Sequence, residues 1–260
     1  MPHAIALHQH SLGTGAPLLI LHGLFGSGTN WRSIARGLAD CRHVIVLDLR
    51  NHGHSPHHDE MDYTVLAADV AAFMDDAGIE VADIIGHSMG GKTAMRLALD
   101  SPERVSRLMV VDIAPAPSGS DHLPLIDAML AMPVNRYTRR SEADTALAAT
   151  VAESSLRSFL LQNLTGGPQG LRWRINLPAI RAAMPALVSF PLGEDEIYPG
   201  EAVFVRGALS DYVREEHAGT IARHFPGAQL QTVQDAGHWV HAEQPERFLE
   251  IARRFLGCDR

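Results

Sequence analysis

The sequence predicts an α/β fold with a mostly parallel central sheet and helices on both of its faces. Apolar runs of strand length alternate with segments of helical period along most of the chain, which is the pattern of repeated strand–helix units. The runs are almost continuously apolar, as strands buried on both faces require. With 260 residues and 46% hydrophobic residues, the chain can build one main core that carries an insertion.

The strands are expected where short apolar runs end in turn-forming residues. Helices are expected where apolar residues recur at i, i+3 and i+4, as they do at Trp31, Ile34 and Leu38. A closing helix is expected to begin at Pro245, since proline is tolerated in the first turn. The expected strands are residues 18–21, 44–49, 82–85, 107–113 and 202–206, with 229–233 as the last.

The alternation breaks after Asp112, where Pro115 and Pro117 open a stretch that stays largely helical. We therefore predict a core of residues 1–114 and 186–260, with a helical cap at 115–185. The cap residues could serve only as extra packing helices. A lid that shapes a substrate pocket is the favoured interpretation, because insertions after the carboxyl ends of strands border the usual site of α/β folds.

Charge argues against several classes of partner. The formal net charge is −8 and no basic run occurs, whereas phosphate binding needs clustered Lys and Arg. The sequence thus predicts no nucleic-acid partner and no adhesion to anionic membranes. The first ten residues lack the features of a signal peptide, and no run of about 18 apolar residues follows. We expect a soluble cytoplasmic monomer or homodimer that acts on a small molecule.

Cysteine and histidine usage gives no clear metal site. Cys41 and Cys258 lie far apart without metal-ligand spacing, so the sequence predicts two free thiols. Histidines crowd one segment beside two acidic residues, but the segment reads as a loop without a regular ligand face, and a metal there is the less favoured alternative. We expect neither a metal nor an organic cofactor. The crowded histidines are His52, His54, His57 and His58.

The motif Gly86-His87-Ser88-Met89-Gly90 fits the nucleophile elbow G-x-S-x-G. It directly follows an apolar strand and precedes a helix-forming run, which is the context that this motif needs. The sharp turn lifts the serine hydroxyl above the sheet, and the glycines allow backbones to pack closely. The sequence therefore predicts an α/β-hydrolase fold with Ser88 as nucleophile.

A serine hydroxyl needs a base that accepts its proton. His238 follows the last expected strand, where the chain order of this fold places the base. The negative charge that develops on the substrate carbonyl needs backbone N–H donors, which we expect from Met89 and Leu24. Phe25 and Trp239 are expected to line the substrate pocket.

The acid that orients His238 has two candidates. Many α/β hydrolases place it after the next-to-last strand in a G-x-x-D pattern, but here Ser210 holds that position and Asp211 is displaced by one residue. Asp112 ends an apolar strand beside the elbow strand, and a buried carboxylate there needs a partner. Asp112 is the favoured acid, with Asp211 left open.

At these residues the chain resembles the YbfF-like esterases, whose animal relatives are the ABHD11 proteins, within the α/β-hydrolase superfamily. The likeness spans nearly the whole chain. It implies a cofactor-free carboxylesterase that acts on small acyl esters or thioesters, and it supports Asp112 as the acid. The motifs that carry it are residues 22–27, 48–55, 86–92 and 237–243, together with 159–164 and 173–177 in the cap.

We thus expect a serine carboxylesterase that hydrolyses esters of small or medium acyl chains, with thioesters as further candidate substrates. Ser88 excludes the haloalkane dehalogenases and epoxide hydrolases of this fold, which need an aspartate at that position. A cofactor-free perhydrolase or a carbon–carbon bond hydrolase could use the same triad. A non-catalytic ligand receptor on this scaffold is a third alternative, which the pairing of Ser88 with His238 disfavours.

Overall fold

A seven-stranded sheet forms the centre of the computed structural model, which describes residues 4–119, 122–167 and 170–258. The strand order is β1-β3-β2-β4-β5-β8-β9, and every neighbouring pair is parallel except β1–β3. This confirms the α/β class and the mostly parallel sheet. The strands are β1 (Gln9–Leu12), β2 (Pro17–Leu21), β3 (His43–Leu47), β4 (Ala82–His87), β5 (Val105–Val111), β8 (Glu201–Gly207) and β9 (Ala228–Val233).

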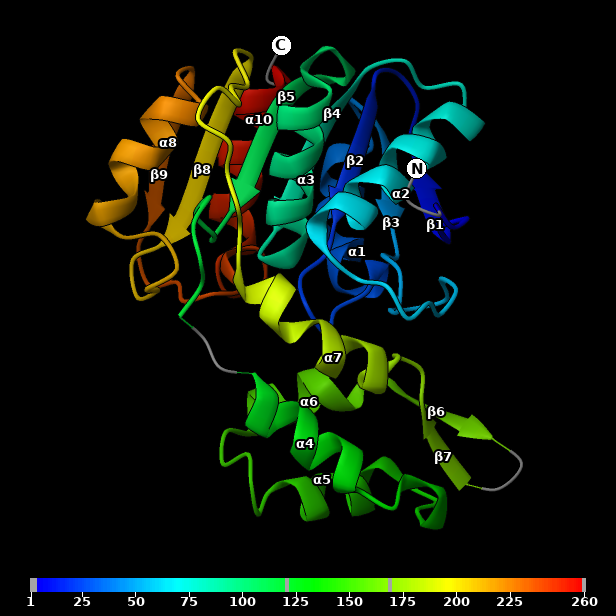
Figure 1. Cartoon of the computed structure of the whole chain (residues 1–260). Helices are drawn as coiled ribbons and strands as arrows, with labels where there is room; N and C mark the ends of the chain where they lie inside the picture. The colour runs from blue at the N-terminus through cyan, green and yellow to red at the C-terminus, as the bar shows by residue number, and fades with distance from the viewer. Residues whose placement is uncertain (1–3, 120–121, 168–169, 259–260) are drawn as a thin grey trace.

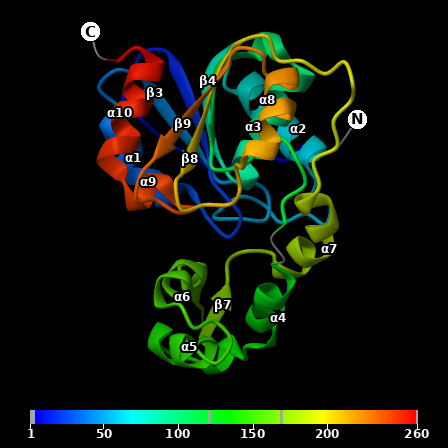
Figure 2. The same cartoon turned by 90° about the vertical axis from the view of Figure 1, so that its left-hand side faces the viewer.

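Helices cover both faces of this sheet, and a separate group of elements lies beyond its carboxyl edge (Figure 1). Helices α1 and α10 lie on one face, and α2, α3 and α8 lie on the other (Figure 2). The core helices are α1 (Arg32–Leu38), α2 (Tyr63–Asp76), α3 (Met89–Asp100), α8 (Ala218–His224), α9 (Val240–Glu243) and α10 (Pro245–Leu256).

The helix boundaries follow from local chemistry. Asp62 accepts a hydrogen bond from the Val65 N–H at 2.9 Å and so caps the first turn of α2. Helix α10 begins at Pro245, as expected, and buries Phe248, Ala252 and Leu256 at i, i+4 and i+8. Gly257 ends it with a φ of 72°, the left-handed conformation that glycine adopts without strain.

The group beyond the sheet comprises four helices and a two-stranded hairpin among the described residues. It corresponds to the expected cap, but it is not purely helical, and the expected boundary at residue 185 falls inside α7. In the two described strands of the hairpin only Leu164 is buried, and neither strand has an apolar run. The elements are α4 (Leu123–Ala131), α5 (Arg140–Leu147), α6 (Ser154–Leu161), β6 (Leu164–Gly167), β7 (Gly170–Trp173) and α7 (Leu177–Val188).

The expected strands are all present, with shifted ends, while β1 was not expected. β1 is an edge strand of three polar, exposed residues followed by Leu12, so no apolar run signals it. β3 ends at Leu47, whereas the sequence predicted a strand to Leu49. Asp48 leaves the strand because its side chain turns to accept the Gly28 N–H at 2.7 Å.

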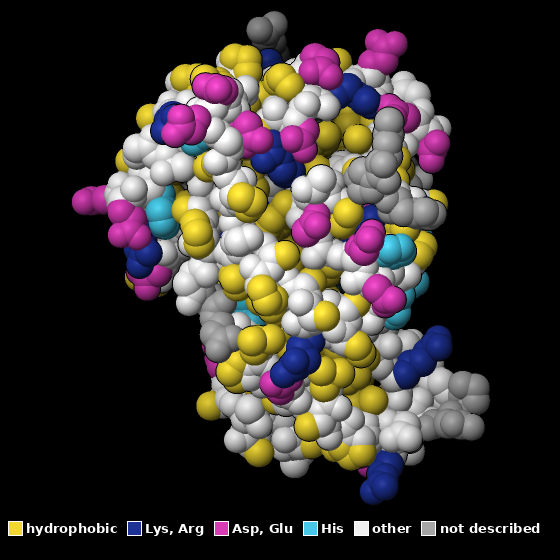
Figure 3. All heavy atoms as spheres, viewed as in Figure 1, with side chains coloured by type: hydrophobic (Ala, Val, Ile, Leu, Met, Phe, Trp, Pro, Cys, Tyr) yellow, Lys and Arg dark blue, Asp and Glu magenta, His cyan; other side chains and the backbone are white. Residues whose placement is uncertain are grey.

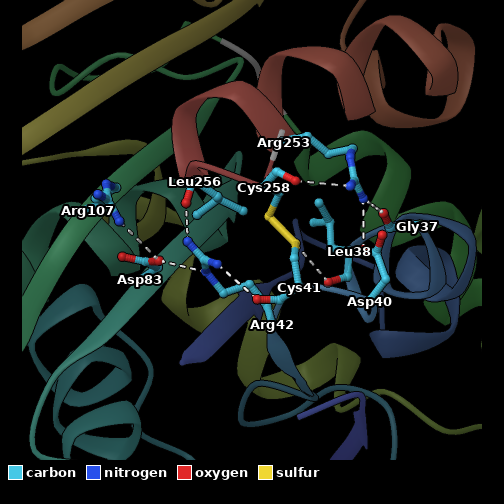
Figure 4. The surroundings of a disulfide bond; sticks show 10 residues. All are labelled: Gly37, Leu38, Asp40, Cys41, Arg42, Asp83, Arg107, Arg253, Leu256 and Cys258. Carbon is cyan, nitrogen blue, oxygen red and sulfur yellow. Dashed lines mark hydrogen bonds and ion pairs between the residues drawn. A yellow bond between two sulfur atoms is a disulfide. The ribbon is translucent and has the colours of Figure 1, made fainter. Parts of the chain in front are cut away.

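The prediction of two free thiols was wrong, because Cys41 and Cys258 form a disulfide (Figure 4). The two residues are 217 positions apart in sequence, with Cα atoms 5.7 Å apart. They meet because α1 and α10 pack against each other on one face of the sheet. Arg253 of α10 strengthens this contact by donating to Asp40 at 2.8 Å. No helix of the described residues combines the length and the apolar character that crossing a membrane requires.

Candidate active site

Ser88 occupies a sharp turn between β4 and α3. Its φ of 52° and ψ of −117° are unusual for a residue with a side chain, as the nucleophile elbow requires. A Cβ atom on Gly90 would lie 2.3 Å from the Leu21 carbonyl oxygen, so only glycine permits α3 to approach β2 this closely. Met89 is the first residue of α3, where backbone N–H groups lack partners within the helix.

His238 and Asp112 are 126 positions apart in the sequence, and the fold brings their side chains into contact. His238 Nδ1 lies 2.7 Å from Asp112 Oδ2, and the carboxylate is fully buried. Asp112 follows β5 with a φ of 50°. Its other oxygen accepts the Gly207 N–H from the end of β8 at 3.0 Å. The bond fixes the imidazole with Nδ1 toward the acid, leaving Nε2 available to a neighbouring hydroxyl.

The strand register explains why Asp112 lies next to the elbow. His87 pairs with Val111 across β4 and β5, and the Ser88 N–H donates to the Val111 carbonyl at 3.0 Å. The residues that follow, Ser88 and Asp112, thus leave neighbouring strands at the same edge of the sheet. Asp211, the alternative acid, is exposed to solvent.

Ser210 stands at the position where many α/β hydrolases have their acid, and its hydroxyl donates to Asp112 Oδ2. At the usual acid position this chain therefore has a serine, which hydrogen-bonds the carboxylate of Asp112 at the end of β5. Sequence reasoning identified this position but assigned no role to the serine.

Two aromatic residues and one acidic residue hold His238 in place. Tyr212 stacks on the His238 ring, with centroids 4.1 Å apart. His87 Nε2 lies 2.8 Å from the His238 carbonyl oxygen, and burial lowers the pKa of His87 well below its usual value. Glu243 accepts the N–H groups of Gly237 at 2.6 Å and of Trp239 at 3.1 Å. The histidine loop is thereby fixed on both sides of the imidazole.

The turn after β2 approaches the elbow closely. A Cβ atom on Gly23 would lie 2.8 Å from the His87 ring and 3.2 Å from Ser88 Cβ. Phe25 has a φ of 62° and donates its N–H to His52 Nε2 at 3.2 Å. Burial lowers the pKa of His52 to about 3, so its Nε2 is a neutral acceptor. The Phe25 N–H is therefore engaged, whereas Leu24 borders the same small cavity as Ser88.

Two cavities lined by described residues lie between the core and the cap. The smaller encloses about 30 Å³ beside Ser88 and holds only a small group. The larger encloses about 540 Å³, within the range of small-molecule sites. The smaller is lined by Leu24, Tyr63, Ser88, Met89, Lys92, Ile113, Ser118, His122, Met184, Leu187, Val188 and Tyr212.

The two residues expected to line the pocket differ in position. Trp239 borders the larger cavity, where its ring lies 5.6 Å from that of Phe159 in the cap. Phe25 is buried and does not line either of these two cavities. Its ring meets His122 edge-on, and its carbonyl accepts from Asn163 of the cap at 2.8 Å. Phe25 thus connects the turn after β2 to the cap.

Lys92 was not singled out by sequence reasoning as a site residue, although it is the only lysine of the chain. Its side chain is buried in the wall of the smaller cavity, four residues after Ser88 on α3. The ammonium donates to the carbonyls of Val188 and Ser189 at the end of α7, both at 3.1 Å. Burial lowers the pKa of Lys92 to about 8.

The elbow serine, the buried aspartate–histidine pair and the mostly parallel sheet together define an α/β hydrolase. Residues 16–245 match the family model described as alpha/beta hydrolase fold, and the chain belongs to this family. Its curated relatives include esterases and lipases.

An sn-1-specific diacylglycerol lipase ABHD11 of Xenopus laevis is 44% identical over 93% of this chain and 80% of the relative. Esterase YbfF of Escherichia coli is 34% identical over 96% of each chain. Among solved structures, a marine microorganism esterase superposes with a TM-score of 0.94 at 38% identity, covering 97% of this chain and 100% of that chain. These likenesses support an ester hydrolase and confirm the resemblance seen in the sequence.

Proposed function

We propose that this protein is a serine carboxylesterase that cleaves esters or thioesters of short or medium acyl chains through an acyl-enzyme on Ser88. The observation that carries the proposal is the 2.7 Å contact between His238 Nδ1 and the buried Asp112, beside a serine in the elbow conformation. An imidazole held in this way can accept the Ser88 proton as the hydroxyl attacks the substrate carbonyl.

The reaction then follows from the positions of these groups. The attacking Ser88 oxygen forms a bond to the carbonyl carbon, and the carbonyl oxygen becomes negatively charged. Leu24 and Met89 border the same cavity as Ser88, and their N–H groups would stabilise that charge. The carbonyl double bond then re-forms, the bond from the carbonyl carbon to the alcohol oxygen or thiol sulfur breaks, and His238 gives its proton to that leaving group. A water molecule activated by the same histidine then hydrolyses the acyl-enzyme.

The two cavities support separate sites for the two parts of the ester, the acyl group and the leaving group. The space of about 30 Å³ at Ser88 suits a short acyl group. The larger cavity of about 540 Å³, bordered by Gly23, His87 and Trp239, suits the leaving group. The apolar cap residues Met184 and Leu187 close the acyl side, so acyl length should be restricted.

The proposal is tested by covalent labelling with a fluorophosphonate. Wild-type protein should be labelled at Ser88 and should hydrolyse p-nitrophenyl acetate and butyrate faster than the laurate ester. Ser88→Ala should lose both the label and turnover while keeping its thermal melt, because the substitution removes one oxygen atom. Undiminished labelling of Ser88→Ala would refute the nucleophile, and a maximum at laurate would refute the short acyl pocket.

A further inference from the structure

Residues from two parts of the chain converge on the carboxylate of Asp48. His8 Nδ1 lies 3.1 Å and His54 Nδ1 lies 3.5 Å from Asp48 Oδ2. The three ligand atoms all lie within 4.8 Å of one another. His8 precedes β1, and the other two residues belong to the loop after β3. Histidine side chains gather at this edge of the molecule in the space-filling view (Figure 3).

We propose that His8, Asp48 and His54 form a binding site for a late first-row divalent cation such as Zn²⁺, separate from the catalytic machinery. Two imidazoles and one carboxylate are ligands that zinc binds at about 2.0–2.2 Å. Tetrahedral coordination at such distances places ligand atoms about 3.4 Å apart. The two nitrogens lie 3.1 and 3.5 Å from Asp48 Oδ2, which already matches this spacing, and the exposed imidazoles can rotate to close their own separation of at most 4.8 Å.

The backbone around the site is already fixed in a suitable arrangement. The His54 N–H donates to Asp48 Oδ2 at 2.9 Å, and the Gly28 N–H donates to Oδ1 at 2.7 Å. The Asp48 N–H donates to the His8 carbonyl at 2.9 Å. The His8 N–H donates to the Ser55 hydroxyl at 2.8 Å. These bonds orient the carboxylate and hold both histidines beside it, as groups around metal ligands do in known sites.

Exposure gives the cation a route to the site. The side chains of His8 and His54 are 48% and 58% exposed, whereas that of Asp48 is 5% exposed. A bound ion would therefore be coordinated by the buried Asp48 carboxylate on one side, and at least one of its coordination positions would be open to water. The ion would connect β1 to the loop after β3 and stabilise that edge of the sheet.

The other crowded histidines do not share this position. His52 is buried and accepts the Phe25 N–H. His57 Nε2 lies 2.8 Å from the Arg174 carbonyl, and His58 Nδ1 accepts the Glu60 N–H at 3.1 Å. The metal site is thus not the sequence cluster of residues 52–58, because only His54 of that cluster faces Asp48.

Untagged protein, stripped with EDTA and dialysed, is titrated with Zn²⁺ by isothermal calorimetry and then melted with and without the ion. Wild-type protein should bind one Zn²⁺ per chain and melt at a higher temperature with zinc, because an ion that binds the folded state stabilises it. His8→Ala and His54→Ala should each lose at least about tenfold in affinity and most of the thermal shift. Mg²⁺, which prefers oxygen ligands, should give neither effect.

His10→Ala is the matched control, since it removes another exposed histidine that lies in β1, outside the site. This variant should bind zinc as wild type does. The proposal fails if wild-type protein shows no zinc binding, if His8→Ala and His54→Ala bind as tightly as wild type, or if Mg²⁺ binds equally well. Ester turnover should be the same before and after EDTA treatment, because neither histidine borders the two cavities.

Discussion

The Ser210 hydroxyl donates to Asp112 Oδ2, the same oxygen that lies 2.7 Å from His238 Nδ1. The usual acid position of the fold thus holds a hydrogen-bond donor, and the acid itself comes from the end of β5. The Gly207 N–H also donates to this buried carboxylate, at 3.0 Å to Oδ1, so the aspartate is held in position to stabilise an imidazolium during turnover.

The first prediction concerns the acid. Asp112→Asn should lower kcat by up to about four orders of magnitude, as the equivalent change does in serine proteases, because the imidazole loses its orientation and its cation loses its counter-charge. Asp211→Asn should turn over nearly as wild type does, since Asp211 is exposed. Steady-state kinetics on p-nitrophenyl butyrate measures both. Thermal melts must show that both variants fold. A collapse of kcat in Asp211→Asn with near-normal Asp112→Asn would reverse the assignment.

The second prediction concerns acyl length. Leu187→Ala should enlarge the cavity beside Ser88, because Leu187 is buried in its wall. The ratio of kcat/KM for the hexanoate ester to that for the acetate ester should rise by about tenfold, a typical effect of one or two methylene groups in an apolar pocket.

Leu177→Ala is the control for acyl length. Leu177 is also buried on α7 but does not line that cavity. Both changes should lower stability by about 2–5 kcal/mol, so a shift in the ratio that occurs only in Leu187→Ala reports the pocket rather than the packing. Equal ratios in the two variants would contradict the assignment of the acyl side.

The third prediction concerns pH and Lys92. The folded protein holds the pKa of Lys92 at about 8, below the usual value of 10.5. Between these pH values the unfolded chain binds more protons than the folded protein, so stability should rise with pH across this window. The shift corresponds to about 2–3 kcal/mol between pH 7 and pH 10, and Lys92→Met should lack this contribution.

Because Lys92 is the only lysine, protein labelled with ¹³C at the lysine ε-carbon should show a single lysine resonance. Its NMR titration midpoint should lie near pH 8. A midpoint near the usual lysine value would show that the buried ammonium is not destabilised. Denaturation by urea at pH 7 and pH 10 would then show the same difference in stability for the wild type and Lys92→Met.

The fourth prediction concerns the disulfide. Cys258→Ser should lower the free energy of unfolding by about 2–5 kcal/mol, because the bond joins Cys41 and Cys258 across 217 positions and so constrains a long loop of the unfolded chain. Dithiothreitol should destabilise wild-type protein to a similar extent and leave Cys258→Ser unchanged.

Thiol titration of the denatured, unreduced protein gives the independent check. It should detect no free thiol, whereas two thiols would restore the original prediction from the sequence. Disulfides persist mainly in oxidising compartments. Oxidised protein isolated from its native cells would therefore argue against the expected cytoplasmic location.

Sequence alone predicted the features that a few neighbouring residues encode. The elbow at Ser88 depends on glycines within two residues of it, and the position of His238 depends on the chain order of the fold. The buried parallel strands appear as apolar runs because both of their faces are covered. The polar strand β1 and the hairpin β6–β7 escaped prediction, since neither has such a run.

The tertiary structure decided the features that depend on contacts between distant residues. The register between β4 and β5 places Asp112 beside Ser88, and β8 brings Ser210 to the same carboxylate. The packing of α10 on α1 joins Cys258 to Cys41 across 217 positions. No local pattern encodes these pairs, because strand register and helix packing are set by the summed burial of the whole core rather than by the residues on either side of each partner.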